Sequence, residues 1–506
     1  MSTGPERSPV RDIVPARTSK PSTAANGYAG GKPASARRLL SGWGRTAPSA
    51  GCLVRPDQPG ALADFLLSKG RAEPEGSGEL WPDHRREGGC SGVIARGLGR
   101  SYGDAAQCAG GTVIDTSNFD SIGPIDPVAG TVEVGGGVSL DQLIRRSLPL
   151  GWFLPVSPGT RHVTIGGAIA ADVHGKNHHR DGSFCSHVTS LTLVTPTGTS
   201  AVGPDTDSEL FWATAGGMGL TGVIISASVR LIRVDTSWMS VDSERFEDLD
   251  DLMATMESSD GNYRYSVAWL DCSLGGRAIG RSVLTRGAHV PGSQLGSARS
   301  NVAIALPRSP RLRVPAPAPR GLVNPGTVRA FNELWFRRCP PGQSSALRPL
   351  SSFFYPLDGV GDWNLLYGRG GFVQYQFVVG PSEGEALRQA VVMARDSKVP
   401  ASLAVMKRFG PGNPGPVSFP IEGWTLALDF AVGPPGLPSL LDRLDELVAS
   451  AGGRVYLAKD SRLRPEFLTV MYPRVGELAA VRRRVDPDGV LRSDLSRRLG
   501  LTGEAR

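Results

Sequence analysis

Two glycine-rich segments, Ala95–Asp104 and Pro158–Ala170, constrain this chain more than any other feature of its sequence. In the first, glycines can adopt positive φ because they lack Cβ, so consecutive backbone N–H groups can turn toward an anion. The second contains Gly166 and Gly167, where a flat group can lie against bare backbone. A phosphate loop and a second glycine platform together predict a long ligand with two different ends, such as a dinucleotide.

The main alternative for the first segment is the Rossmann fingerprint, G-x-G-x-x-G at the start of a helix. Here Gly97 and Gly99 are followed by Gly103, one residue late, and the next stretch reaches a glycine pair before it can form a useful helix. A strand-like run, Thr112–Asp115, comes next. The spacing favours a phosphate-binding loop between strands, and a purely structural turn remains the alternative for any single glycine.

Short β-rich runs interleaved with helical pieces predict an α+β fold, because the strands are too irregularly spaced for a doubly wound sheet. In the run Val138–Ser147, Ser139 is a suitable N-cap and the apolar residues fall on one face. The expected strands are 92–95, 112–115, 130–134, 191–194, 222–229, 263–271 and 371–379, and further helices are expected at 384–396 and 437–450.

Composition is that of an ordinary globular protein, with 40% hydrophobic and 20% charged residues among 506. No apolar run approaches the roughly 20 residues of a membrane-spanning helix. Residues 1–38 lack a signal-peptide core and are expected to form a disordered basic tail that carries most of the net charge of +7, so nucleic-acid binding is not indicated. The six cysteines are scattered without a C-x-x-C pair, which suggests neither a zinc site nor a disulfide framework.

The stretch from Cys272 to Asn332 contains nine arginines and no Asp or Glu. Its middle, Pro307–Arg320, is expected to lack regular structure because of its prolines. One interpretation is a mobile, solvated insertion at about 290–325. The other is a basic lid beside a site for an anionic lipid or a phosphorylated membrane surface, where each Arg contributes about 1 kcal/mol.

Further motifs, beyond the two glycine-rich segments, carry a resemblance to a known family across residues 40–500; they are Ser41–Pro48, Glu209–Gly222, Gly371–Phe377, Ser418–Trp424, Ala458–Arg462 and Met471–Arg474. The chain resembles the vanillyl-alcohol-oxidase-like FAD-linked oxidoreductases and, within them, the family of decaprenylphosphoryl-β-D-ribose 2-oxidases. The resemblance implies a two-part FAD-binding domain of the PCMH type at 39–238, an α+β substrate domain with an antiparallel sheet at 239–453, and a C-terminal segment at 454–506 that returns to the FAD domain.

The same resemblance implies FAD-dependent oxidation of the 2′-hydroxyl of a polyprenyl-phosphoryl-β-D-ribose to the 2′-keto intermediate. This is the first half of an epimerisation that makes the arabinose donor for cell-wall arabinan, and a separate NAD(P)H-dependent reductase completes it. Peripheral contact with the plasma membrane is implied, with a cytoplasmic location as the default and the periplasm as the family's alternative. Two other readings stay open: an alditol or aldonolactone oxidase using O₂, and a lipid-phosphate binding protein without turnover.

Individual positions match the family's functional residues. The resemblance assigns Lys459 and His174 to catalysis. The positions matched to FAD binding are Ala95, Arg96, Gly97, Leu98, Gly99, Arg100, Ser101, Tyr102, Gly103, Asp104, Gly159, Thr164, Ile165, Gly166, Gly167, Ala171, Asp172, Val173, His174, Ile224 and Tyr456. The positions matched to substrate binding are Lys176, Trp269, Gln374, Gln376, Lys407, Thr425 and Ala427.

Flavin-dependent oxidation of an alcohol needs a base for the hydroxyl proton and positive charge near the flavin carbonyl that gains electron density. Lys459 is the leading candidate for the charge and for proton transfer; the alternative is a surface lysine paired with Asp460. Gln374 and Gln376 alternate with Tyr375, so both point to one face of a strand, as a polar pocket wall requires.

Five of the seven histidines fall between His162 and His187, but no acidic or cysteine residue shares a ligand-like spacing with them, so no metal site is expected. The phosphate loop offers Arg100–Tyr102 and no His or Cys for a covalent flavin link, which predicts non-covalent FAD. Three positions depart from the family: Thr425 replaces Asn, Phe354 replaces Tyr, and Ala427 replaces the cysteine that nitro-aromatic inhibitors modify. The exact substrate is therefore less constrained than the flavin chemistry.

Overall fold

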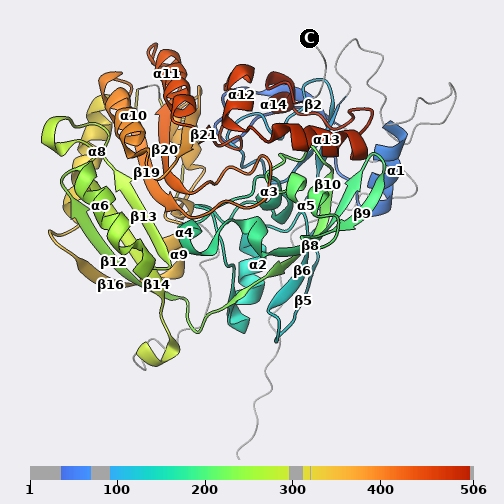
Figure 1. Cartoon of the computed structure of the whole chain (residues 1–506), viewed down its shortest axis with the longest axis horizontal. Coiled ribbons are helices and arrows are strands. Elements are labelled where there is room, and N and C mark those ends of the chain that lie inside the picture. Colours follow the sequence, from blue (N-terminus) through green and yellow to red (C-terminus); the bar gives the residue numbers. More distant parts are fainter. Residues whose placement is uncertain (1–35, 70–91, 296–311, 320, 502–506) are drawn as a thin grey trace, which may run out of the picture.

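In the computed structural model, two groups of sheets lie side by side (Figure 1). The structure describes residues 36–69, 92–295, 312–319 and 321–501. Residues 1–35 of the predicted tail and residues 296–311 and 320 of the Arg/Pro-rich insertion therefore lie outside the described residues. The last three residues of the predicted tail, 36–38, belong to strand β1 (Ala36–Leu40), so the expected disorder does not extend to them. Within the described residues, no helix is both long enough and apolar enough to span a bilayer.

Two smaller sheets form the right-hand part of Figure 1. The first has the order β1-β2-β4-β3, with parallel pairing of β4 to both neighbours. The second is antiparallel with the order β5-β6-β10-β8-β9. Their strands are β1 (Ala36–Leu40), β2 (Ser49–Val54), β3 (Val93–Arg96), β4 (Thr112–Asp115), β5 (Ile122–Ile125), β6 (Thr131–Gly135), β8 (Val188–Thr195), β9 (Gly198–Val202) and β10 (Val223–Arg230).

The helices of this part begin where the sequence provides caps. In α2 (Leu140–Ser147), Ser139 and Gln142 form a capping box, which confirms Ser139 as the N-cap. The short α3 (Ile165–Ala170) starts at the second glycine segment, where Thr164 Oγ1 accepts a hydrogen bond from Gly167 N at 3.1 Å. Two more helices, α1 (Pro59–Lys69) and α5 (Ser208–Thr214), pack beside β8 and β9.

An eight-stranded antiparallel sheet dominates the left-hand part of Figure 1, as the fold class predicted. Its order is β16-β12-β14-β13-β19-β20-β18-β21. The strands are β12 (Trp238–Phe246), β13 (Tyr265–Leu270), β14 (Ser282–His289), β16 (Ser344–Pro349), β18 (Phe372–Val379), β19 (Ala401–Phe409), β20 (Gly423–Ala431) and β21 (Arg454–Val455). The helices around it are α6 (Leu249–Ser259), α8 (Pro325–Arg338), α9 (Leu350–Phe354), α10 (Gly384–Asp396) and α11 (Leu437–Ser450).

The two faces of this sheet differ in character because side chains alternate along each strand. One cross-strand row is fully buried in the main core and consists of Leu284, Ala268, Met406, Leu426 and Phe377. The row on the opposite face consists of Val283, Trp269, Val405, Ala427 and Gln376. The second row faces the glycine-rich loops, so the sheet brings its side chains to the same cavity as those loops.

The C-terminal segment joins both parts. Its first residues add β21 to the edge of the eight-stranded sheet beside β18. The chain then forms α12 (Pro465–Met471), α13 (Val475–Val485) and α14 (Asp494–Arg498). Val93 N donates to Val490 O at 2.8 Å, and Arg492 N donates to Val93 O at 2.9 Å, which attaches this segment to β3.

One expectation about the insertion is wrong. Leu312–Arg313 forms the short strand β15, which pairs in parallel with β17 (Val360–Gly361). The segment from Arg311 to Val314 contains no proline, so both N–H groups remain free to pair even though prolines flank it.

Candidate active site

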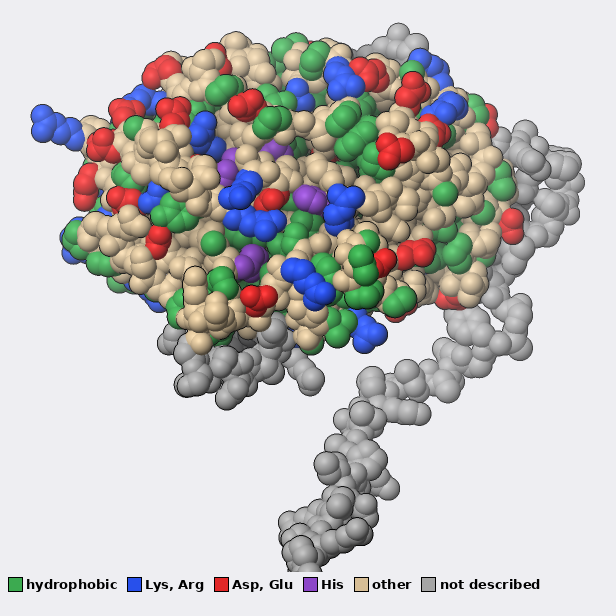
Figure 2. Space-filling view, turned by 60° about the horizontal axis from the view of Figure 1, so that its bottom comes forward, with side chains coloured by type: hydrophobic (Ala, Val, Ile, Leu, Met, Phe, Trp, Pro, Cys, Tyr) green, Lys and Arg blue, Asp and Glu red, His purple; other side chains and the backbone are tan. Residues whose placement is uncertain are grey.

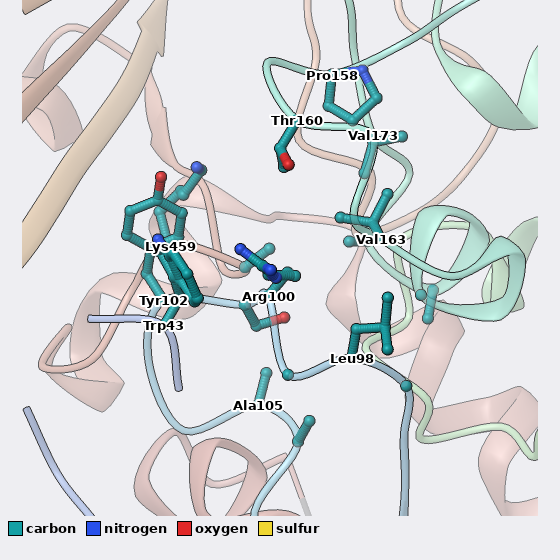
Figure 3. A pocket seen from close by; sticks show the side chains of 18 of the residues that line it. Trp43, Leu98, Arg100, Tyr102, Ala105, Pro158, Thr160, Val163, Val173 and Lys459 are labelled. Carbon is teal, nitrogen blue, oxygen red and sulfur yellow. The ribbon is translucent and has the colours of Figure 1, made fainter. Parts of the chain in front are cut away.

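One cavity is lined by both glycine-rich segments, by strands β18 to β20 and by residues Tyr456 to Lys459. Figure 3 shows Lys459, Tyr102 and Trp43 grouped on one side, Leu98 and Val163 on the other, and Arg100 between them. One side of the cavity therefore carries a lysine and aromatic rings, and the opposite side carries aliphatic side chains.

The loop after β3 has the features of a phosphate cradle. Gly99 has φ +63°, which L-residues rarely adopt, and a Cβ at Gly97 would lie 2.2 Å from Thr164 Oγ1. Within the described residues, the backbone N–H groups from Leu98 to Ser101 donate to no protein acceptor. Four consecutive unused donors beside a cavity form an anion-binding nest, so this loop fits the diphosphate of a dinucleotide such as FAD.

The second segment fits a flat ring system. Gly166 N donates to Gly136 O at 2.8 Å, and a Cβ at Gly166 would approach that carbonyl oxygen to 3.1 Å. Gly166 and Gly167 both line the cavity and present backbone rather than side chains to it. Together, cradle and platform fit FAD on this chain's own geometry.

The platform leads directly to a buried histidine. Gln376 Nε2 donates to His174 Nε2 at 2.9 Å and lies 3.2 Å from Thr425 Oγ1. Burial and then the charge of Lys407 lower the pKa of His174 well below its usual value, so the ring is neutral. If Nε2 accepts from Gln376, the proton resides on Nδ1, which is buried without a partner in the protein. That nitrogen is a free hydrogen-bonding group beside the cavity.

Lys459 lies beside Tyr102, with Nζ 3.6 Å from the ring centroid. Burial lowers the pKa of Lys459 to about 7, although Asp429 opposes this effect. Burial raises the pKa of Asp429 to about 6, and Gln374 donates a hydrogen bond to its carboxylate. Burial also lowers the pKa of Lys407 to about 8. The redox end thus holds two lysines whose proton affinities have been brought toward neutral pH.

The alternative interpretation, in which Lys459 is a surface lysine paired with Asp460, is wrong. The Asp460 carboxylate lies 2.9 Å from Arg498 Nη2 and accepts from the backbone N–H groups of Arg462 and Leu463 at 2.8 Å. It therefore turns away from the cavity and leaves the ammonium of Lys459 to the pocket.

Most of the predicted positions line this cavity. They are Ala95, Gly97, Leu98, Gly99, Arg100, Ser101, Tyr102, Gly159, Thr164, Gly166, Gly167, Ala171, Val173, His174, Ile224, Gln374, Gln376, Lys407, Ala427, Tyr456 and Lys459. The positions outside its lining are Arg96, Gly103, Asp104, Ile165, Asp172, Lys176, Trp269 and Thr425. Several of the latter hold the lining in place.

Two acidic residues in this second group anchor the loops. Asp104 accepts two hydrogen bonds from Arg498 of α14, at 3.0 and 2.8 Å. Asp172, at φ +39°, accepts hydrogen bonds from Asn413 and Ser418. These contacts attach the phosphate loop to the C-terminal segment and the platform to the loop between β19 and β20.

Three predicted substrate residues point elsewhere. Lys176 Nζ donates to the carbonyl oxygens of Phe353 and Phe354, at the end of α9. Trp269 belongs to the cavity-facing row of the sheet but packs in the cluster of Val283 and α8. Thr425 lies behind Gln376 and donates to a backbone oxygen of β18 at 2.8 Å.

Several lining residues were not among the predictions. Trp43 stacks under Arg100, whose guanidinium carbon is 3.8 Å from the ring centroid, and Trp363 meets Trp43 edge-on at 5.9 Å. Leu403 and Val405 also line the cavity. Their alternation with Lys407 on one strand was a usable signal, whereas Trp363 belongs to no motif in the sequence.

The cavity is formed by a phosphate-binding loop between strands, a glycine platform and the eight-stranded sheet. This combination defines an FAD-linked oxidoreductase. Residues 90–202 match the family described as the FAD binding domain. The decaprenylphosphoryl-β-D-ribose oxidase of Mycolicibacterium smegmatis is 42% identical over 474 residues, which cover 93% of this chain and 98% of that protein. An uncharacterised protein of Streptomyces coelicolor is 42% identical over 72% of this chain and 100% of its own length. The chain belongs to the decaprenylphosphoryl-β-D-ribose oxidase family.

Proposed function

We propose that this protein oxidises the 2′-hydroxyl of a polyprenyl-phosphoryl-β-D-ribose to the 2′-ketone, with FAD as the oxidant. The observation that carries the proposal is that Lys459, Lys407 and the His174–Gln376 pair line the same cavity as the phosphate cradle. Near-complete coverage of the mycobacterial oxidase at 42% identity supports the same substrate class.

Bound FAD would supply the acceptor for the two electrons and the hydrogen of the carbinol C–H bond. Lys459 takes the hydroxyl proton: a pKa near 7 means that a large share of the side chain is neutral at physiological pH and can accept it. Once protonated, the same ammonium provides positive charge at the point where negative charge grows.

The remaining polar groups of the cavity bind and orient the substrate. His174 stays neutral and offers Nδ1 as a directional hydrogen-bonding group, while Gln376 holds its ring from the other side. Lys407 adds a second cation on β19, suited to the phosphate of the substrate. Ala427 leaves space in the cavity wall where the family has a larger side chain.

FAD is held non-covalently in this proposal. The phosphate loop carries neither His nor Cys, and the cavity lining contains none of the five cysteines in the described residues. The buried Cys185 is a poor nucleophile, since burial raises its pKa well above the usual value.

The product requires a separate NAD(P)H-dependent reductase to complete the epimerisation to the arabinose donor. The lipid tail of the substrate implies peripheral contact with the plasma membrane, on its cytoplasmic side by default and with the periplasm as the family's alternative. The reductase and the membrane contact are thus part of the same proposal.

The decisive experiment is anaerobic mixing of the FAD-loaded protein with polyprenyl-phosphoryl ribose, in parallel with simple alditols and aldonolactones. Bleaching of the oxidised flavin by the prenyl-phosphoryl sugar, with little change in the other mixtures, is expected. Faster bleaching by alditols would assign the protein to sugar-alcohol oxidation instead.

A further inference from the structure

An exposed aromatic flank on α8 has no role in the chemistry described above. Phe331, Leu334 and Trp335 have 51%, 71% and 39% of their surface exposed. Their spacing of three and four residues places them on one side of the helix. The rings of Phe331 and Trp335 stack with centroids 6.0 Å apart. Large apolar side chains grouped on one exposed surface mark an interaction site more often than isolated ones do.

The inner side of α8 is firmly attached to the eight-stranded sheet. Asn332 Nδ2 donates to Asp271 Oδ1 at 2.7 Å, and Arg281 links Asp271 to Glu333 with contacts of 3.0 and 2.6 Å. Phe336 is buried beside Val283. The exposed flank is therefore displayed by a helix in a defined orientation.

This helix lies on the sheet face that lines the cavity. Paired residues of neighbouring strands point to the same face. The row from the cavity to α8 is Gln376, Ala427, Val405, Trp269 and Val283. The first three line the cavity, and the last two pack with Phe336. The face of the eight-stranded sheet that lines the redox pocket therefore also carries α8, which is labelled in the left-hand part of Figure 1.

The charged side chains around the exposed flank are mostly basic, which favours a partner that is both apolar and negatively charged. The helix carries Arg329, Arg337 and Arg338 against the single acid Glu333. The guanidinium carbon of Arg338 lies 5.9 Å from the Trp335 ring centroid. Aromatic and aliphatic side chains bordered by arginines are typical of helices that lie in the interface of an anionic membrane. Figure 2 shows one face of the molecule, and Lys and Arg side chains gather near its middle.

We infer that the α8 flank docks on an anionic lipid bilayer and so holds the lipid-linked substrate near the redox pocket, which lies on the same face of the eight-stranded sheet. The inference rests on the proposed function for its substrate, but the docking itself does not require turnover. The bilayer is the partner that we assign to this flank.

Vesicle flotation with the FAD-loaded full chain tests the docking. The vesicles contain phosphatidylcholine with 30 mol% phosphatidylglycerol in one arm and phosphatidylcholine alone in the other. The triple variant Phe331→Gln, Leu334→Gln, Trp335→Gln keeps a helix-compatible residue at each exposed position. The matched control, Val128→Gln, Leu150→Gln, Val470→Gln, removes three exposed apolar side chains elsewhere on the molecule.

The wild type and the control should float with the anionic vesicles, and the triple α8 variant should bind them at least ten-fold more weakly. Binding to pure phosphatidylcholine should be much weaker for all three proteins. Unchanged flotation of the α8 variant would overturn the inference, as would equal binding to both vesicle types. A wild-type dimer in ultracentrifugation that dissociates in the α8 variant, without vesicle binding, would make the flank an interface between copies.

Flavin reduction separates this inference from the proposed function. Vesicle-embedded long-chain polyprenyl-phosphoryl ribose should reduce the α8 variant at least ten-fold more slowly than the wild type, whereas a water-soluble geranyl-phosphoryl ribose should reduce both alike. Equal loss with both substrates would contradict a docking role. If neither substrate reduces the flavin of the wild type, the proposed activity is refuted, and the flotation result is unaffected.

Discussion

At the scale of single residues, several titratable groups in and next to the cavity wall are buried, and their pKa values differ from those in water. Lys459, Lys407 and Asp429 all have their pKa values moved toward neutrality by burial. Such shifts cost folding free energy, so the presence of both lysines in the wall of one cavity, with Asp429 hydrogen-bonded to Gln374 of that wall, is the strongest residue-level sign of function.

Lys459→Ala should abolish substrate-dependent flavin reduction and retain bound FAD. Removal of one preorganised electrostatic group typically lowers the rate by roughly 10²–10³. Lys459→Arg should not restore activity, because guanidinium keeps its proton and has a different shape. Stopped-flow flavin reduction measures the rate, and the flavin content of the purified variant is the control. A rate above about a tenth of the wild type, where chemistry limits turnover, would remove Lys459 from the mechanism and direct attention to His174.

The pH dependence should report the pKa of Lys459. If the neutral amine accepts the hydroxyl proton, kcat/KM should rise as pH increases through about 7 and then level off. Asp429 favours the protonated lysine, so the isosteric Asp429→Asn should move that rise to lower pH. A profile whose midpoint stays in place, or moves to higher pH, would contradict the assignment of Lys459 as the base.

Ala427→Cys should make the protein susceptible to covalent modification by nitro-aromatic inhibitors, because a thiolate can add to their reduced form and a methyl group cannot. Residue 427 faces the cavity beside Gln376 on the neighbouring strand. Intact-protein mass spectrometry after turnover in the presence of inhibitor measures the adduct. Equal labelling of the wild type would show that another cysteine reacts.

At the scale of elements, the C-terminal helix α14 controls the cofactor loop. Arg498 bridges Asp104, at the end of the phosphate loop, and Asp460, which follows Lys459 in the chain. It also donates to Leu463 O at 2.9 Å. One guanidinium thereby fixes the positions of two segments that are remote in sequence but adjacent in the pocket wall.

Arg498→Gln should weaken FAD binding at least ten-fold and lower the thermal transition, because it leaves two buried carboxylates facing each other without a cation. Fluorescence titration of the apoprotein with FAD measures the first effect and calorimetry the second. Arg484→Gln breaks an exposed ion pair with Asp207 and should change neither by much. Wild-type FAD affinity in Arg498→Gln would show that the bridge does not position the phosphate loop for FAD.

At the scale of the whole molecule, FAD would contact both groups of sheets, so its binding should stabilise their association. Because FAD is expected to dissociate, added FAD should raise the melting temperature of the apoprotein. At a free FAD concentration of 100 times Kd, binding increases the free energy of unfolding by about 2.7 kcal/mol. Acid or heat should release all flavin into the supernatant. Flavin that stays on the denatured polypeptide, or a melting temperature insensitive to FAD, would refute non-covalent binding.

Much of this molecule could be predicted from local sequence. Glycine spacing identified the phosphate loop, strand alternation placed Gln374 and Gln376 on one wall, and Ser139 marked a helix start that the structure confirms. The strands expected at 112–115 and 371–379 appear as β4 and β18 within a residue. These features depend on φ, hydrogen bonds or side-chain period over a few neighbours, so adjacent residues suffice to specify them.

Only the tertiary structure decided which side chains share the pocket. Lys176 and Trp269 belong to the right segments yet turn toward α9 and α8, while Trp363, from a segment without any motif, lines the cavity. Asp460 pairs with Arg498 rather than with the lysine beside it. Such choices are made by contacts between residues far apart in the chain, where burial and charge balance outweigh local preference. The sequence therefore determined the kind of site, and packing determined its membership.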